Sequence, residues 1–86
     1  ETFRCLDLAY QALAAGGVAP ATLNAANEEA VAAFLAGELP FLSIATVIEE
    51  CLIRLPSAPI GDLASLLDSD LTARREAQRI IAGLAT

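Results

Sequence analysis

The longest uncharged stretch of the chain runs for twenty residues, from Leu8 to Asn27, and it decides what the N-terminal half can form. A membrane-spanning helix needs about twenty mostly apolar residues with an unbroken backbone ladder. This stretch instead has Gly16, Gly17 and Pro20 at its centre. Glycine supplies the left-handed residue that often ends a helix, and proline suits the first turn of the next one. The stretch therefore predicts two helices joined by a tight turn rather than a membrane span.

The clearest helical stripe lies between Ser43 and Pro56. Its apolar members are Ile44, Val47, Ile48, Cys51, Leu52 and Leu55. They follow the spacing i, i+3, i+4, i+7, i+8, i+11 that one face of an α-helix requires. Ser43 is the expected N-cap, and Pro56 is expected to end the helix. The stripe predicts a helix over 44–55.

Similar stripes predict two helices before this one. The first ends at Gly16, where a left-handed residue is expected. Its shared apolar face comprises Phe3, Leu6, Tyr10 and Leu13. The second begins at Pro20 and ends near Gly37, with Asn24 as an alternative N-cap. Its stripe comprises Leu23, Ala26, Ala30, Val31, Phe34 and Leu35.

The last third of the chain predicts a short helix followed by a longer one. After a turn-rich connector at 56–61, Asp62 is the expected cap of a short helix that ends at Leu67. Short polar side chains at 68–70 favour a break, because such residues prefer caps to helix interiors. The last helix is expected over 71–84, with Ala77, Ile81 and Leu84 facing inward. The sequence therefore predicts one all-α domain over residues 1–86, a compact bundle-like array of four main helices plus one short helix.

The chain is more apolar than its size requires. Hydrophobic residues make up 56% of the sequence, against about 45–50% in ordinary globular domains. We therefore expect part of the apolar surface to dock on another body. Methionine is absent, including at position 1, so we expect a processed chain or, preferably, a piece of a longer one.

The charge balance disfavours two classes of partner. Five arginines and eleven acidic residues give a net charge of −6, the wrong sign for nucleic acid and for anionic membrane surfaces. We therefore expect no nucleic-acid and no membrane partner. A small basic group remains at Arg74, Arg75 and Arg79. Ordinary cations on a helix surface are the favoured interpretation, and a phosphate site is the alternative.

Asn24, Asn27 and Glu28 form the most informative polar group. Their i, i+3, i+4 spacing places them on one helix face within an alanine-rich segment, with Glu29 beside them. A ligand site is one interpretation, but a carboxylate without a second catalytic group nearby does not make an active site. The favoured interpretation is interdomain docking through these three side chains, with no catalytic, cofactor-binding or metal-ligating residue in the chain.

The two cysteines, Cys5 and Cys51, have no histidine partner and no CxxC spacing. Cys51 lies within the apolar stripe of the third predicted helix. We expect two buried free thiols that pack as small hydrophobic residues, with a disulfide or a reactive thiol as the alternative.

Several segments carry a resemblance to a known family. They are Phe3–Tyr10, Gly16-Gly17, the LNAANE motif within Pro20–Glu28, the AVAAFL run at Ala30–Leu35, and Phe41–Ile44. The segment from Asp62 to Asp70, with Ala73 and Arg74 beyond it, adds support. Over nearly all of its 86 residues the chain resembles the C-terminal helical domain of 1-deoxy-D-xylulose 5-phosphate reductoisomerase. LNAANE and AVAAFL are the specific part of this resemblance.

The resemblance implies a domain of a larger enzyme. That enzyme converts 1-deoxy-D-xylulose 5-phosphate to 2-C-methyl-D-erythritol 4-phosphate by rearrangement and NADPH-dependent reduction, in the non-mevalonate pathway of isoprenoid biosynthesis. It uses Mg²⁺ or Mn²⁺, is typically a homodimer, and works in the bacterial cytoplasm or, in plants, in the plastid. The NADPH, metal and phosphate sites belong to its other domains, so the resemblance implies that this chain binds none of these groups and packs against the rest of the same polypeptide.

Two other functions are compatible with the sequence. A stand-alone acidic helical interaction module would suit the size and the charge. An acyl-carrier-like domain is the other, because the sequence from Asp68 to Leu71 is loosely similar to the Asp-Ser-Leu attachment site of such carriers. Here, however, Asp70 separates Ser69 from the leucine, and the serine lies late in the chain.

Overall fold

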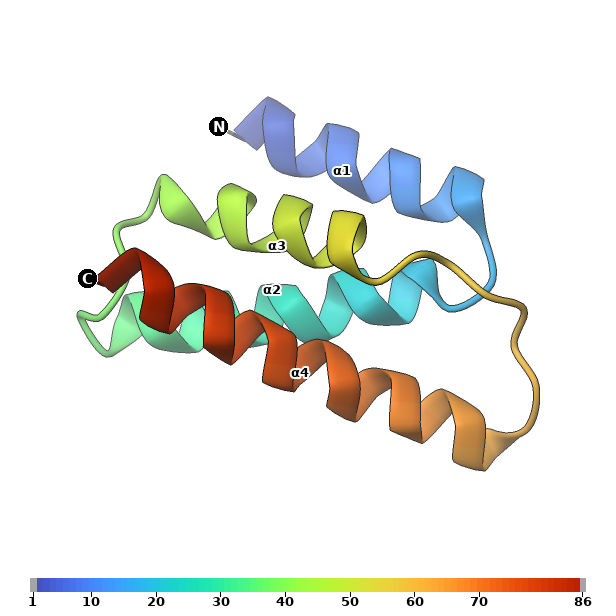
Figure 1. The fold of residues 1–86 in the computed structure, drawn as a ribbon. Coiled ribbons are helices and arrows are strands. Elements are labelled where there is room, and N and C mark those ends of the chain that lie inside the picture. Colours follow the sequence, from blue (N-terminus) through green and yellow to red (C-terminus); the bar gives the residue numbers. More distant parts are fainter. Residues whose placement is uncertain (1, 86) are drawn as a thin grey trace.

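The computed structural model describes the backbone of residues 2–85 and the side chains of residues 4–84. Within this range the chain forms four helices and no strand (Figure 1). They are α1 (Thr2–Ala15), α2 (Ala19–Leu35), α3 (Ser43–Arg54) and α4 (Leu63–Ala85). The predicted all-α, bundle-like array is confirmed.

Helices α2 and α3 form the centre of the array, because each of them packs against the other three helices. Helices α1 and α4 lie on different sides of this pair, and their described residues make no close backbone contact with each other (Figure 1). Small side chains allow this close packing. Ala25, Ala26 and Ala30 of α2 are completely buried, as are Val47 and Cys51 of α3. The core therefore forms where α3 and α4 lie against the alanine-rich side of α2.

The turn between α1 and α2 has the predicted conformation. Gly16 and Gly17 have φ angles of +69° and +55°, in the left-handed region that glycine enters at little cost. The turn is also tied to the connector between α3 and α4. The Val18 N–H donates to the carbonyl oxygen of Ala58 at 2.9 Å, and the Ser57 hydroxyl donates to the carbonyl oxygen of Gly16 at 2.7 Å. Two loops far apart in sequence thus hold each other at one end of the molecule.

The starts of α2 and α3 differ in detail from the sequence expectation. Helix α2 begins at Ala19 with proline in its first turn, so Asn24 lies inside the helix and is not an N-cap. Ser43 is the first residue of α3, and Leu42 occupies the cap position without a side-chain hydrogen bond. The turn before α3 explains this, because the N–H groups of Ser43 and Ile44 donate to the carbonyl oxygens of Pro40 and Phe41 at 3.0 and 3.2 Å. The backbone itself satisfies a donor that a side-chain cap would otherwise bind.

Helix α4 corrects the prediction for the last third of the chain. Asp62 caps its start as expected, accepting a hydrogen bond from the Ser65 N–H at 2.8 Å. The expected break at 68–70 is absent, so the short helix and the last helix are one. The Asp70 carboxylate accepts a hydrogen bond from Arg74 Nε, one turn later, at 2.8 Å. A side chain engaged in an i, i+4 pair supports the helix instead of competing for its backbone donors.

Part of the predicted inner surface faces outward. In α1 the side chains of Leu6, Tyr10 and Leu13 are 50–65% exposed, and Leu8 and Ala12 face the core instead. Phe3, also part of the predicted stripe, lies outside the described side chains.

The apolar side chains of the other helices divide in the same way. In α4, Ala77 and Ile81 are buried as predicted, but Leu84 is 47% exposed. Further exposed apolar residues are Phe34, Leu35, Phe41, Leu42, Ile53, Ile60, Leu63, Leu67 and Leu71. Among the described residues, no helix combines the length and the apolar character that crossing a membrane requires.

Candidate functional site

The outer side of α2 carries the three side chains singled out from the sequence. Asn24, Asn27 and Glu28 are all exposed there. Further along the same helix Val31 is half-buried and Leu35 is 76% exposed. We call these five residues the α2 strip. Its members share one helix face, as the spacing predicted, but their neighbours differ: Glu28 contacts α4, and Asn27 borders a groove shared with α1 and α3.

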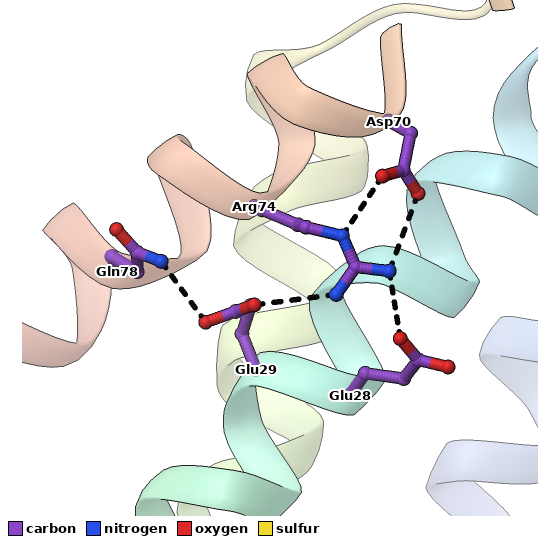
Figure 2. A network of polar contacts seen from close by, with 5 residues as sticks. All are labelled: Glu28, Glu29, Asp70, Arg74 and Gln78. Carbon is purple, nitrogen blue, oxygen red and sulfur yellow. Dashed lines mark hydrogen bonds and ion pairs between the residues drawn. The ribbon is translucent and has the colours of Figure 1, made fainter. Parts of the chain in front are cut away.

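Glu28 belongs to a polar network centred on Arg74 of α4 (Figure 2). Arg74 Nη2 donates to Glu28 Oε1 at 2.7 Å, and Nη1 donates to Glu29 Oε2 at 3.3 Å. Arg74 Nε donates to Asp70 Oδ2 at 2.8 Å. Gln78 closes the network, since its Nε2 atom donates to Glu29 Oε1 at 3.1 Å. Three carboxylates therefore surround one guanidinium, and two of them come from α2.

This network changes the interpretation of the three arginines. The hydrogen bonds that Arg74 donates to Asp70, and then those to Glu28 and Glu29, raise the pKa of Arg74 above its ordinary value. A guanidinium whose donors face three carboxylates offers little to a phosphate, so Arg74 does not fit the phosphate alternative. It is an interhelical bridge rather than an ordinary surface cation.

The other two arginines differ from Arg74. Arg79 pairs with Glu76 on its own helix at 2.7 Å, and Arg75 is exposed. The i, i+4 spacing of Asp70 and Arg74 was visible in the sequence, but the contacts with α2 were not.

The described residues do not fit the metal ion or the dinucleotide that the resemblance implies for the larger enzyme. Within residues 2–85 no group of three or more carboxylate or thiol side chains is arranged to hold a metal ion. Glu28, Glu29 and Asp70 do converge, but they converge on the guanidinium of Arg74. A dinucleotide cradle needs a strand followed by a glycine-rich turn, and the described backbone has no strand.

Asn27 lines a groove between α1, α2 and the start of α3. The other lining residues, all with apolar side chains, are Cys5, Val31, Phe41, Leu42, Ile44 and Ala45. We call this the Asn27 groove. Its volume is about 260 Å³. Pockets for small molecules and cofactors usually measure about 300–1,000 Å³, so this groove is better matched to a few protein side chains. Sequence spacing could not have found it, because it forms only where the α2–α3 turn folds back.

A larger groove lies between the C-terminal halves of α2 and α4. Its volume is about 530 Å³, and its lining includes Glu29, Glu38, Gln78 and Ile81. Two of these polar groups are already engaged, because Gln78 donates to Glu29 and Glu29 also accepts from Arg74. The groove is acidic, because its lining residues include two carboxylates, Glu29 and Glu38, and no arginine. It therefore does not suit an anionic ligand.

Both cysteines are free thiols. Cys51 is completely buried, and this burial is the main reason why its thiol pKa rises from 9.0 to about 11. Such a thiol is protonated and unreactive at neutral pH. Cys5 is half-buried at the edge of the Asn27 groove. The free-thiol interpretation is confirmed, with the qualification that Cys5 is not fully buried.

Ser69 does not have the position that a carrier domain requires. It lies inside α4 and is half-buried. An attachment serine must instead open a helix and be accessible. The structure therefore gives no support to the acyl-carrier alternative.

Comparisons between this chain and known proteins identify its family. A family model described as the DXP reductoisomerase C-terminal domain matches residues 1–76. A 1-deoxy-D-xylulose 5-phosphate reductoisomerase from Dechloromonas aromatica is 57% identical over 81 residues, which cover 94% of this chain and 20% of that protein. The proteins of the same name from Cupriavidus necator and Methylococcus capsulatus are 49% and 51% identical, over 96% and 92% of this chain and 21% and 20% of theirs. The chain thus spans about a fifth of the length of these relatives. It belongs to the DXP reductoisomerase C-terminal domain family.

Proposed function

We propose that this chain is the C-terminal docking domain of an enzyme that converts 1-deoxy-D-xylulose 5-phosphate to 2-C-methyl-D-erythritol 4-phosphate. The observation that carries the proposal is the family match over residues 1–76 together with relatives five times as long. The reaction, with its NADPH and its Mg²⁺ or Mn²⁺, belongs to the remaining domains. The homodimeric state and the cytoplasmic location of the enzyme are part of the same proposal.

The role proposed for residues 1–86 is to support the catalytic part mechanically rather than to take part in the chemistry. Asn24 and Asn27 are exposed, and their amides can each donate and accept hydrogen bonds from a neighbouring backbone. Glu28 is held in place by Arg74. A rigid helix that presents polar groups beside apolar residues has the composition of a docking surface between domains. We propose that Asn24, Asn27 and Glu28 contact the preceding domains.

Three proteins test this function: the full-length enzyme, the enzyme truncated before Glu1, and residues 1–86 alone. The assay follows NADPH oxidation with 1-deoxy-D-xylulose 5-phosphate and Mn²⁺, and circular dichroism checks that each protein is folded. We expect turnover from the full-length enzyme, none from residues 1–86, and lower activity and thermal stability after truncation. Turnover by residues 1–86 would refute the non-catalytic role. A truncated enzyme as active and stable as the full-length one would refute the docking role.

A further inference from the structure

We propose that the polypeptide that precedes Glu1 in the longer chain docks in the Asn27 groove. This inference rests on the proposed docking function and names the surface that performs it. The occupant is a part of the same polypeptide, inserting apolar side chains into the groove and offering backbone groups to Asn27.

The position of the groove relative to the chain entry is the first argument. The matching family is a C-terminal domain and most of the relatives' length lies outside this match, so the remaining domains enter through the start of α1. Cys5 lies one helical turn from that start and lines the groove. In Figure 1 the N-terminal end of α1 and the start of α3 lie at the same end of the molecule. The groove therefore lies beside the start of α1, where the remaining domains connect to this one.

The chemistry of the groove is the second argument. Phe41 and Leu42 are 57% and 60% exposed at its edge, although large apolar side chains gain free energy from burial. Phe41 is held in an edge-to-face contact with Phe34, with ring centroids 5.5 Å apart, so part of this edge is preorganised. Asn27 is the only lining residue with a polar amide. An apolar centre with one amide suits a peptide segment that brings both side chains and backbone.

A second exposed apolar surface lies on α4, and a substitution there serves as the control. Leu63, Leu67 and Leu71 form an exposed apolar row along its first half, with 69%, 60% and 44% of each residue exposed. This half of α4 lies at the opposite end of the molecule from the start of α1 (Figure 1). Leu42 and Leu67 have the same exposed fraction of 60%, so the same substitution at each compares the two surfaces directly.

The test measures alkylation of Cys5 by N-ethylmaleimide in the full-length enzyme, read out by mass spectrometry of the peptide that contains it. The proteins are the natural sequence, Leu42→Gln and Leu67→Gln; glutamine has a helix propensity close to that of leucine and no charge. We expect slow alkylation of Cys5 in the natural sequence and in Leu67→Gln. In Leu42→Gln, where the contact between the groove and the docked segment is weakened, we expect alkylation to be about tenfold faster or more. Cys51 is the internal reference for a thiol that stays buried in all three proteins.

Three results would overturn the inference. The first is rapid alkylation of Cys5 in the natural full-length enzyme, which would show an open groove. The second is faster alkylation or lower thermal stability in Leu67→Gln with no change in Leu42→Gln. That result would mean that the preceding polypeptide docks on α4. The third is protection of Cys5 that is lost when the enzyme dissociates into monomers, which would assign the groove to a second copy. Failure of the proposed function looks different, because it would leave activity and stability unchanged when residues 1–86 are removed.

Discussion

Arg74 on α4 and Glu28 on α2, 46 positions apart in sequence, are joined by a hydrogen bond of 2.7 Å between Nη2 and Oε1. The same guanidinium uses Nη1 for Glu29 and Nε for Asp70. A planar group with donors in a fixed fork can satisfy several carboxylates at once, which an ammonium group does less well. The bridge therefore fixes the strip of α2 that carries Asn24 and Asn27 relative to α4.

Replacing Arg74 tests how much this bridge stabilises the domain. We expect Arg74→Gln to lower the melting temperature, because Glu28, Glu29 and Asp70 would then repel one another. The melting temperature of Arg74→Lys should lie between those of the natural sequence and Arg74→Gln, since lysine keeps the charge but lacks the forked donors of the guanidinium. Salt should reduce the difference between the natural sequence and Arg74→Gln, because the groups are partly exposed. The measurement is thermal unfolding by circular dichroism at low and high salt.

Arg75→Gln is the matched control for that series. Arg75 is the next residue on the same helix and is exposed. Its replacement changes the net charge by the same amount without touching the bridge. If Arg75→Gln lowered the melting temperature as much as Arg74→Gln, net charge rather than the bridge would explain the effect.

Cys51 predicts a loss of stability at alkaline pH. Burial raises the thiol pKa from 9.0 to about 11 in the folded domain, whereas the unfolded chain keeps the ordinary value. The contribution of the protonated thiol to the free energy of unfolding is therefore complete below pH 9.0 and is lost as the pH rises towards about 11. At pH 10 the loss should be about 1 kcal/mol. Urea unfolding at neutral pH and at pH 10, compared between the natural sequence and Cys51→Ala, measures it.

The comparison with Cys51→Ala is needed because other groups also titrate at high pH. The substitution lowers stability at neutral pH by leaving a small cavity. The informative quantity is the difference between the two proteins as a function of pH. We expect it to shrink on going from neutral pH to pH 10. A difference that stayed constant would mean that the buried thiol does not titrate as its burial requires.

The helix boundaries that could be predicted are those set by local chemistry. Gly16 and Gly17 end α1 with left-handed φ angles, and Asp62 caps α4 through its own side chain. The continuity of α4 could not be predicted, because residues 68–70 are poor helix formers taken alone. Asp70 is stabilised there by Arg74, and Arg74 is in turn held by α2. A tertiary contact thus overrides a local preference.

The candidate site could be predicted only in part from the sequence. Helical spacing was enough to place Asn24, Asn27 and Glu28 on one face of α2. It could not show that Asn27 borders a groove formed with Phe41, since this depends on how the α2–α3 turn packs. The orientation of α1 was also undetermined, because small residues such as Ala12 pack inward where helices approach closely. Spacing identifies a face, but only packing decides what that face meets.

The alanines of α2 should tolerate no larger side chain where the helices meet. Ala26 is completely buried, whereas Ala32 on the same helix is exposed. Ala26→Leu adds three carbon atoms to a packed core and should destabilise the domain by about 1–3 kcal/mol or more. Ala32→Leu should change stability by less than about 0.5 kcal/mol. Urea unfolding of both variants checks this, and equal effects would show that α2 is not closely packed at Ala26.

The turn at Gly16 and Gly17 allows a comparison between two adjacent glycines that differ in their surroundings. Both have positive φ, so an alanine at either position costs about 1–2 kcal/mol of backbone strain. A Cβ atom at Gly16 would meet no atom within 4 Å. A Cβ atom at Gly17 would overlap the carbonyl oxygen of Ala58, the acceptor for the Val18 N–H. Gly17→Ala must therefore displace the connector between α3 and α4 as well as strain the turn.

We expect Gly16→Ala to lower the free energy of unfolding by about 1–2 kcal/mol and Gly17→Ala by about 3 kcal/mol or more. Hydrogen exchange distinguishes the cause, because only Gly17→Ala should speed exchange of the Val18 amide, whose acceptor is Ala58. Equal losses of stability with unchanged exchange at Val18 would mean that the connector does not lie against the turn. That result would remove the contact through which the α1–α2 turn and the α3–α4 connector hold each other.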